Sequence, residues 1–180
     1  MKNIEFYVNQ IKENKDIEDY LSCECGIDFE SREILEDDLS ALMECGKCDY
    51  TLNPFGCDGS GGIYAVLDNG KIGYIDSEGQ AGIVANNIKD FFSIIINCGY
   101  ISDWAKFGCL ENKETFMSYF YEIEIPRNEE FIKRFIKDNL LESQPEKIYD
   151  IFKEAVISEP KLIIVATSED YEDSVQLFEL

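Results

Sequence analysis

Residues 59–85 read GSGGIYAVLDNGKIGYIDSEGQAGIVA and predict three short strands joined by turns. The opening glycines disfavour a helix, because each costs about 1 kcal/mol relative to alanine. Ile63–Leu67 is followed by an Asn-Gly pair, which supplies the two positive-φ positions of a type I′ turn. Lys71–Asp76 is therefore expected to return antiparallel. After a second glycine-containing turn, Ile83–Ala85 reads as the third strand.

The period of the apolar residues changes from 2 to 3.6 after this stretch. Asn86 or Asn87 can cap a helix, and Gly99 can end it in a left-handed position. Apolar residues recur with the i, i+3, i+4, i+7 spacing of an amphipathic helix at Ile88, Phe91, Phe92 and Ile95.

This region resembles the SUKH superfamily of bacterial immunity proteins, which share a fold with a fungal regulator of cell-wall synthesis. The matching words are Gly73-Tyr74-Ile75, Ser77-Glu78-Gly79, Ala81-Gly82 and Phe91-Phe92, and the likeness covers residues 53–98, about a quarter of the chain. The resemblance implies a SUKH-like α+β domain that binds and neutralises a cognate toxin.

The remaining chain is mostly helical. Apolar spacing and proline positions predict helices around 4–11, 17–21, 31–44, 116–125, from Asn128 to Leu140, and from Pro145 towards Pro160. The buried aromatic face predicted for the helix at 116–125 includes Tyr121. Leu162–Ala166 reads as a strand covered on both sides, and Val175–Glu179 as an edge strand. The sequence leaves open where the strand at 162–166 joins the sheet.

These elements predict one α+β domain over residues 1–180, with a helical extension and a strand pair in 112–180. We expect a twisted, largely antiparallel sheet with helices packed on one face and flank. The chain is 45% apolar, so it should fold despite a net charge of −21. The first twenty residues lack the apolar run of a signal peptide, and no apolar run approaches the roughly 18 residues of a bilayer helix. We expect a cytoplasmic protein that does not enter a membrane.

Seven cysteines without a secretion signal indicate reduced thiols. Cys23 and Cys25 form a C-x-C, and Cys45 and Cys48 form a C-x-x-C, so four thiolates could close a zinc site. The favoured interpretation is that these four are small apolar residues beside turns. Cys57, Cys98 and Cys109 are interpreted as buried packing residues. No cofactor is expected.

Catalytic patterns are weak, and the chain has no histidine to activate a nucleophile. Ser60 stands in a glycine-rich turn with only Lys71 and Lys89 near it in sequence. The same glycines lead into a strand without the lysine of a phosphate-binding loop. Asp68-Asn69-Gly70 lacks the glutamate that would complete a calcium loop, so a hairpin turn is favoured. We therefore expect no enzymatic activity.

Acidity is the remaining chemical signal. Residues 16–49 hold twelve carboxylates against Arg32 and Lys47, and a second acidic group lies at 169–173. Nucleic acid is excluded as a direct ligand, because its binding depends on cationic contacts to phosphate. We expect a basic toxin, a nuclease, as partner, and the candidate contacts are Glu24, Asp28, Glu36, Asp37, Asp38, Glu78 and Gln80. Alternatives are a merely solubilising surface, a cytoplasmic regulatory or scaffold protein, or a zinc-stabilised domain of unknown activity. The sequence does not indicate an oligomeric state.

Overall fold

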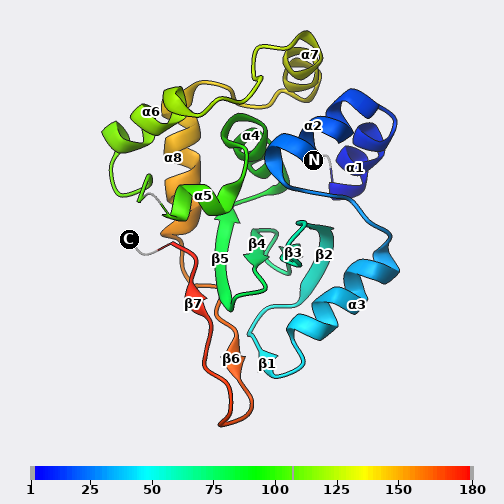
Figure 1. The fold of residues 1–180 in the computed structure, drawn as a ribbon, viewed down its shortest axis with the longest axis vertical. Coiled ribbons are helices and arrows are strands. Elements are labelled where there is room, and N and C mark those ends of the chain that lie inside the picture. The colour runs from blue at the N-terminus through cyan, green and yellow to red at the C-terminus, as the bar shows by residue number, and fades with distance from the viewer. Residues whose placement is uncertain (1–2, 107, 179–180) are drawn as a thin grey trace.

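The computed structural model describes residues 3–106 and 108–178 and has an α+β fold (Figure 1). The helices are α1 (Ile4–Lys12), α2 (Lys15–Cys25), α3 (Arg32–Leu42), α4 (Ile88–Cys98), α5 (Ile101–Lys106), α6 (Lys113–Glu122), α7 (Glu130–Asn139) and α8 (Pro145–Val156). The strands are β1 (Gly46–Lys47), β2 (Leu52–Cys57), β3 (Ile63–Leu67), β4 (Ile72–Ile75), β5 (Gln80–Ala85), β6 (Val165–Ala166) and β7 (Val175–Gln176).

The main sheet has the order β2-β3-β4-β5-β7. The pairs from β2 to β5 are antiparallel, and β7 lies parallel to β5 at the edge. The predicted antiparallel sheet and the edge position of Val175 are thus confirmed. The third predicted strand begins earlier than expected, at Gln80.

β2 was not predicted, because Pro54 and Gly56 both weaken a strand. The pairing of β2 with β3 shifts register between these two residues. A bulge at this position accommodates the proline, which has no N–H to donate to a ladder.

Three hairpin loops connect β2 to β5, and each contains a glycine with positive φ. These are Gly61 (+91°), Gly70 (+83°) and Gly79 (+87°), nine residues apart. In the central loop Leu67 accepts from the amide of Gly70 at 2.9 Å and donates to the carbonyl of Lys71 at 2.8 Å. Among the described non-glycine residues only Leu140 has positive φ. The predicted type I′ turn is therefore wrong, and the loop is a three-residue turn ending in a glycine bulge.

One face of the sheet packs against most of the helices, and aromatic rings fill the contact. Tyr64 lies 4.6 Å from Tyr74 and 5.4 Å from Phe91, measured between ring centroids. Phe91 and Phe92 of α4 are fully buried. These paired aromatics of α4 thus lie in the larger of the two hydrophobic clusters of the protein.

The opposite face is covered by apolar side chains of α3 and of residues 162–164. Leu67, Ile75 and Ile83 belong to this second cluster together with Leu162 and Ile164. A β-carbon on Gly73 would come within 2.6 Å of the Leu162 side chain, so glycine lets this segment pack closely. α3 itself lies along β2 at the flank of the sheet (Figure 1).

The segment 162–166 differs from its prediction as a strand covered on both sides. Only Val165–Ala166 is a strand, and it pairs with β1 in a separate two-stranded sheet. Leu162 and Ile164 are buried, whereas Ile163 and Val165 are about 40% exposed. The side chains alternate because one face packs and the other meets solvent.

Several helix ends also differ from the predictions. The side chain of Asn87 caps α4, but Gly99 ends it with ψ of −139°, outside the left-handed helical region. α7 is capped at Glu129, one residue after the predicted start at Asn128. The predicted apolar stripe residue Leu140 is a C-cap with φ of 54° and is 76% exposed. Tyr121, expected on a buried face, is 70% exposed.

Candidate functional site

The loops at residues 58–62 and 76–80 lie at the same end of the sheet, because β2, β3, β4 and β5 form successive hairpins. A β-carbon on Gly61 would be 3.8 Å from Cβ of Ser77, so the two loops are in contact. Each begins with an aspartate that accepts amide hydrogen bonds from its own loop. Oδ1 of Asp76 accepts from the amides of Glu78 at 2.9 Å and Gln80 at 2.7 Å.

Asp58 is the more heavily hydrogen-bonded of these two aspartates. Its Oδ1 accepts from the amide and hydroxyl of Ser60 at 2.8 and 3.0 Å and from the amide of Gly62 at 2.9 Å. Its Oδ2 accepts from the hydroxyl of Tyr74. Burial alone would raise the pKa of Asp58, but these hydrogen bonds outweigh burial and lower it. A charged Asp58 therefore fixes the loop.

Further carboxylates gather around Cys57 at the end of β2. The segment at Asp28 pairs with Cys57 through two backbone hydrogen bonds of 2.8 and 3.0 Å. Burial raises the pKa of Cys57 to about 11, and the charges that add to this rise are those of Asp28, Glu30, Asp38 and Asp58. The structure thus brings the predicted Asp28 and Asp38 together. Cys57 itself is only half-buried, contrary to its predicted burial.

Glu30 and Asp58 were not singled out from the sequence. For Asp58 the sequence holds an indirect indication, because Asp58 and Asp76 occupy the same position in an Asp-x-x-Gly loop pattern. That pattern marks aspartates that cap turns, and it would have placed both at one end of the sheet.

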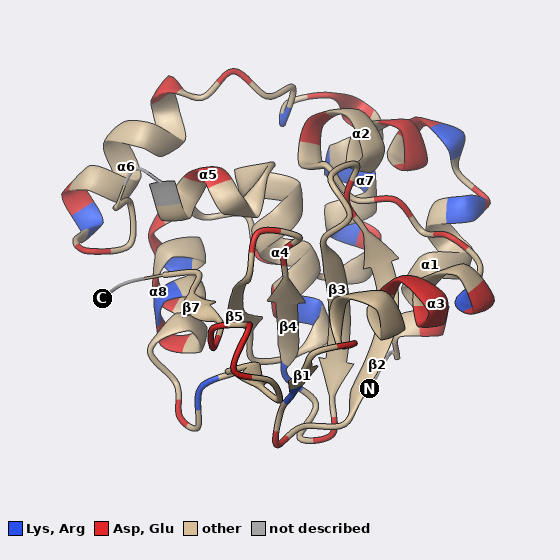
Figure 2. Ribbon diagram, turned by 60° about the horizontal axis from the view of Figure 1, so that its bottom comes forward, with Lys and Arg blue, Asp and Glu red and all other residues tan. Residues whose placement is uncertain are grey.

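The predicted contacts Glu36, Asp37 and Asp38 are all exposed on α3. Glu36 accepts from Nε of Arg32 at 2.6 Å, one helical turn away, so part of its charge is neutralised. Within residues 3–106 and 108–178, Asp37 and Asp38 have no basic partner. Figure 2 shows the acidic colouring of α3 and the small number of basic residues around it.

The other three predicted contacts occupy different surroundings. Glu24 is half-buried near the end of α2, where its carbonyl faces Gly99. Glu78 is exposed in the loop that touches the Asp58 loop. Gln80 pairs with Val175 in the ladder between β5 and β7, so its backbone belongs to the sheet. The centre of the candidate surface is the group of carboxylates near Cys57, named here the acidic end: Asp28, Glu30, Asp38 and Asp58.

The four cysteines of the zinc alternative lie in different surroundings. Cys23 is exposed, whereas Cys25 is fully buried. Gly46 and Lys47 form β1, so Cys45 and Cys48 flank an extended strand, although a C-x-x-C half-site needs a turn. Within the described residues, no group of three or more Cys, Asp or Glu could hold a metal ion.

Ser60 is placed as the predicted turn residue. Its hydroxyl donates to Asp58, and Lys71 lies in the loop at the other end of β3. Nζ of Lys71 donates to the carbonyl of Glu159 at 3.5 Å. A Ser60–Lys71 pair is therefore not formed.

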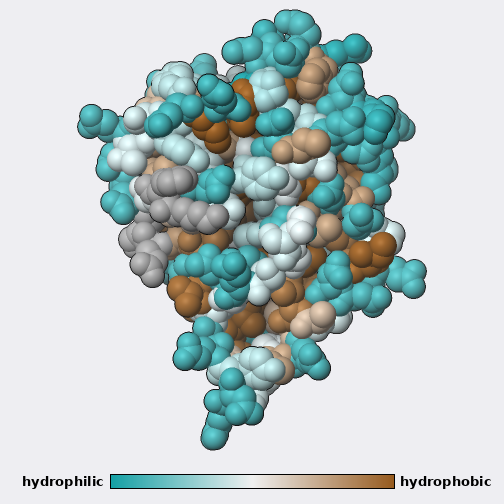
Figure 3. Space-filling model, in the orientation of Figure 1, coloured by the Kyte–Doolittle hydropathy of each residue, from teal (hydrophilic) through white to brown (hydrophobic). Residues whose placement is uncertain are grey.

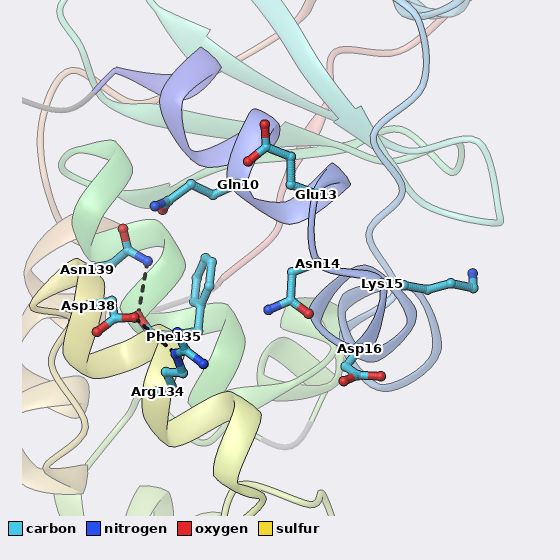
Figure 4. Close-up of a pocket in the computed structure, with 9 residues that line it drawn as sticks. All are labelled: Gln10, Glu13, Asn14, Lys15, Asp16, Arg134, Phe135, Asp138 and Asn139. Atoms are coloured by element: carbon cyan, nitrogen blue, oxygen red, sulfur yellow. Dashed lines mark hydrogen bonds and ion pairs between the residues drawn. The ribbon is translucent and has the colours of Figure 1, made fainter.

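A polar cavity of about 430 Å³ lies between the α1–α2 turn and α7 (Figure 4). Gln10 and Asn139 point into the space between these helices, and Arg134 lies 3.6 Å from Asp138 in an ion pair. Its lining mixes both charges, with Glu13, Lys15 and Asp16 on the opposite wall. The cavity thus presents no single kind of charge to a ligand.

Hydrophobic side chains on the face drawn in Figure 3 form separate patches among hydrophilic residues. Within the described ranges, none of the helices has the length and apolar character needed to cross a bilayer. Comparisons with models of known protein families, with curated proteins and with solved structures found no match to this chain.

Proposed function

We propose that this protein is an immunity protein that binds a basic nuclease toxin and neutralises it by covering the toxin's cationic substrate groove. The observation that carries the proposal is the acidic end, where the bridge between Asp28 and Cys57 places Asp28 near Asp58, and the charges of Glu30 and Asp38 also act on Cys57. A nuclease groove holds phosphates with lysine and arginine, and carboxylates can occupy the same positions.

Rigid elements hold these carboxylates. Asp38 lies on α3, Asp28 is paired to β2, and Asp58 is tied to its loop by the amides of Ser60 and Gly62. A rigid surface loses little conformational entropy on binding, so more of the electrostatic attraction remains as affinity. The exposed Asp37 on α3 extends the same surface.

Attraction between an acidic and a basic surface mainly raises the association rate and selects partners of the right charge. A chain of net charge −21 should therefore meet a basic toxin quickly in the cytoplasm, the compartment we propose for it. No chemical step is required of the immunity protein.

The proposal is tested by purifying the chain together with a basic nuclease domain encoded by an adjacent reading frame. We expect a stable complex in which DNA or RNA cleavage stops at equimolar protein. A complex that leaves cleavage unchanged would instead support the regulatory or scaffold alternative. Absence of any complex would leave the acidic residues as a solubilising surface.

A further inference from the structure

A cavity of about 440 Å³ lies between the end of α4, the end of α6 and α7. Its lining residues are polar, basic, aromatic or aliphatic: Asn97, Phe120, Tyr121, Arg127, Asn128, Lys133, Ile136 and Ser143. None of them is a carboxylate, although the chain has 37 acidic and 16 basic residues. Four other cavities lined by described residues each include at least two carboxylates. The lining of this cavity is therefore positively charged, whereas the protein as a whole is negatively charged.

Arg127 is held firmly at this cavity. Its Nε donates to the carbonyl oxygen of Asn97 at 2.6 Å, and its Cζ lies 4.1 Å from the centroid of the Phe120 ring. Asn97 is buried, and its side-chain amide donates to the carbonyls of Ser93 and Glu142 at 2.7 and 3.1 Å. The carbonyl and the ring together fix both the position and the plane of the guanidinium.

Part of the same guanidinium lacks a protein partner. Nη2 of Arg127 is buried without a hydrogen bond, and no described carboxylate forms an ion pair with Arg127. Burial lowers the pKa of Arg127, which remains charged because arginine keeps its proton at physiological pH. A charged guanidinium donor forms strong hydrogen bonds with the oxygens of a carboxylate or phosphate.

We propose that this cavity binds the phosphate or carboxylate group of a small molecule, with Arg127 as the charged hydrogen-bond donor. Lys133, which contacts the exposed Glu130 at 3.3 Å, supplies a second positive charge. Phe120 and Tyr121 line the wall that would contact the rest of the molecule. The volume falls within the roughly 300–1,000 Å³ of small-molecule sites. The proposal is independent of toxin binding, since it involves other residues.

Nuclear magnetic resonance of the arginine side chains tests the proposal on the unmodified protein. The chain has three arginines, and Arg32 and Arg134 serve as internal controls because each pairs with an acid on its own helix. Inorganic phosphate and succinate are titrated separately, with sodium chloride holding the ionic strength constant. We expect the Nε–Hε signal of Arg127 alone to shift and saturate, and the tighter of the two probes identifies the preferred group. Equal shifts of all three signals, or no saturable shift, would overturn the proposal.

Substitutions provide a second test by calorimetry with the same two probes. Arg127→Gln should weaken binding about tenfold or more, because it removes a charged hydrogen-bond donor. Arg134→Gln, the matched control at an exposed side chain of α7, should bind like the original protein. If Arg127→Gln does not fold, the exposed Lys133→Gln replaces it and should weaken binding several-fold. Unchanged affinity in the variant that folds would contradict the site.

Discussion

Replacing Tyr74 by phenylalanine isolates one hydrogen bond that fixes Asp58 at the acidic end. Tyr74 is 3% exposed, and its hydroxyl donates to Oδ2 of the half-buried Asp58. A hydrogen bond to a charged group contributes about 1.5–3 kcal/mol to stability. Water can replace part of it because Asp58 is only half-buried, so we expect a loss near the lower end, about 1.5–2 kcal/mol. For a chain of this length that corresponds to a fall of about 3–8 °C in melting temperature.

Urea denaturation of Tyr74→Phe measures this loss directly, and Tyr121→Phe is the matched control. Tyr121 is 70% exposed, so removal of its hydroxyl should change the free energy of unfolding by less than about 0.5 kcal/mol. A Tyr74→Phe protein as stable as the Tyr121→Phe control would refute the role assigned to this hydrogen bond.

The same bond predicts a pH dependence. The folded-state pKa of Asp58 is lowered, so its contribution is fully present above its unfolded pKa of about 3.9. It is lost as the pH falls through the folded-state pKa. The difference in unfolding free energy between the original protein and Asp58→Asn should therefore be constant near neutral pH and shrink below about pH 4. A difference that grows on acidification would contradict this assignment.

Further predictions concern the turns and the cysteines. Gly70→Val should lower the unfolding free energy by about 1–3 kcal/mol, because Gly70 has φ of +83°, as measured by urea denaturation. Gly82 does not have positive φ, so Gly82→Val should instead act by crowding Leu177, whose Cβ would lie 3.1 Å away. A chelator should leave the melting temperature unchanged, and a sharp fall would restore the zinc alternative. Mass spectrometry after brief iodoacetamide treatment at neutral pH should find Cys23 modified before Cys57, whose pKa is raised to about 11.

Elements with a strong local signal could be predicted from the sequence. The spacing of apolar residues places the helix from Ile88, and proline at the first position marks the start of α8. The hairpin at residues 63–75 follows from the alternation of residues around Asn69 and Gly70. Its loop has three residues, one more than the type I′ turn predicted from the Asn-Gly pair. The SUKH resemblance stays a prediction.

Elements that depend on distant packing could not be predicted. β2 needs a bulge to accommodate Pro54, and the strand at Val165 depends on pairing with β1, more than a hundred residues earlier. The acidic end has the same origin. Asp28 and Asp58 lie thirty residues apart, and the bridge between Asp28 and Cys57 brings them together.

The central claim is tested most directly by the association rate with the neighbouring basic nuclease domain, measured at several salt concentrations. The test variant reverses the charge of Asp38, which belongs to the acidic end, and of its exposed neighbours Glu36 and Asp37 on α3. The control reverses the same number of exposed charges at Glu169, Asp170 and Glu172, and omits Asp173, whose Oδ1 accepts from the amide of Ala166.

We expect association of the original protein to exceed the unsteered range of about 10⁵–10⁶ M⁻¹s⁻¹ and to fall with salt. The α3 reversal should slow it about tenfold or more at low salt, and the control should slow it less, while both keep melting temperatures within about two degrees. Equal effects of the two sets, or a rate that responds neither to salt nor to reversal, would contradict recognition through the acidic end.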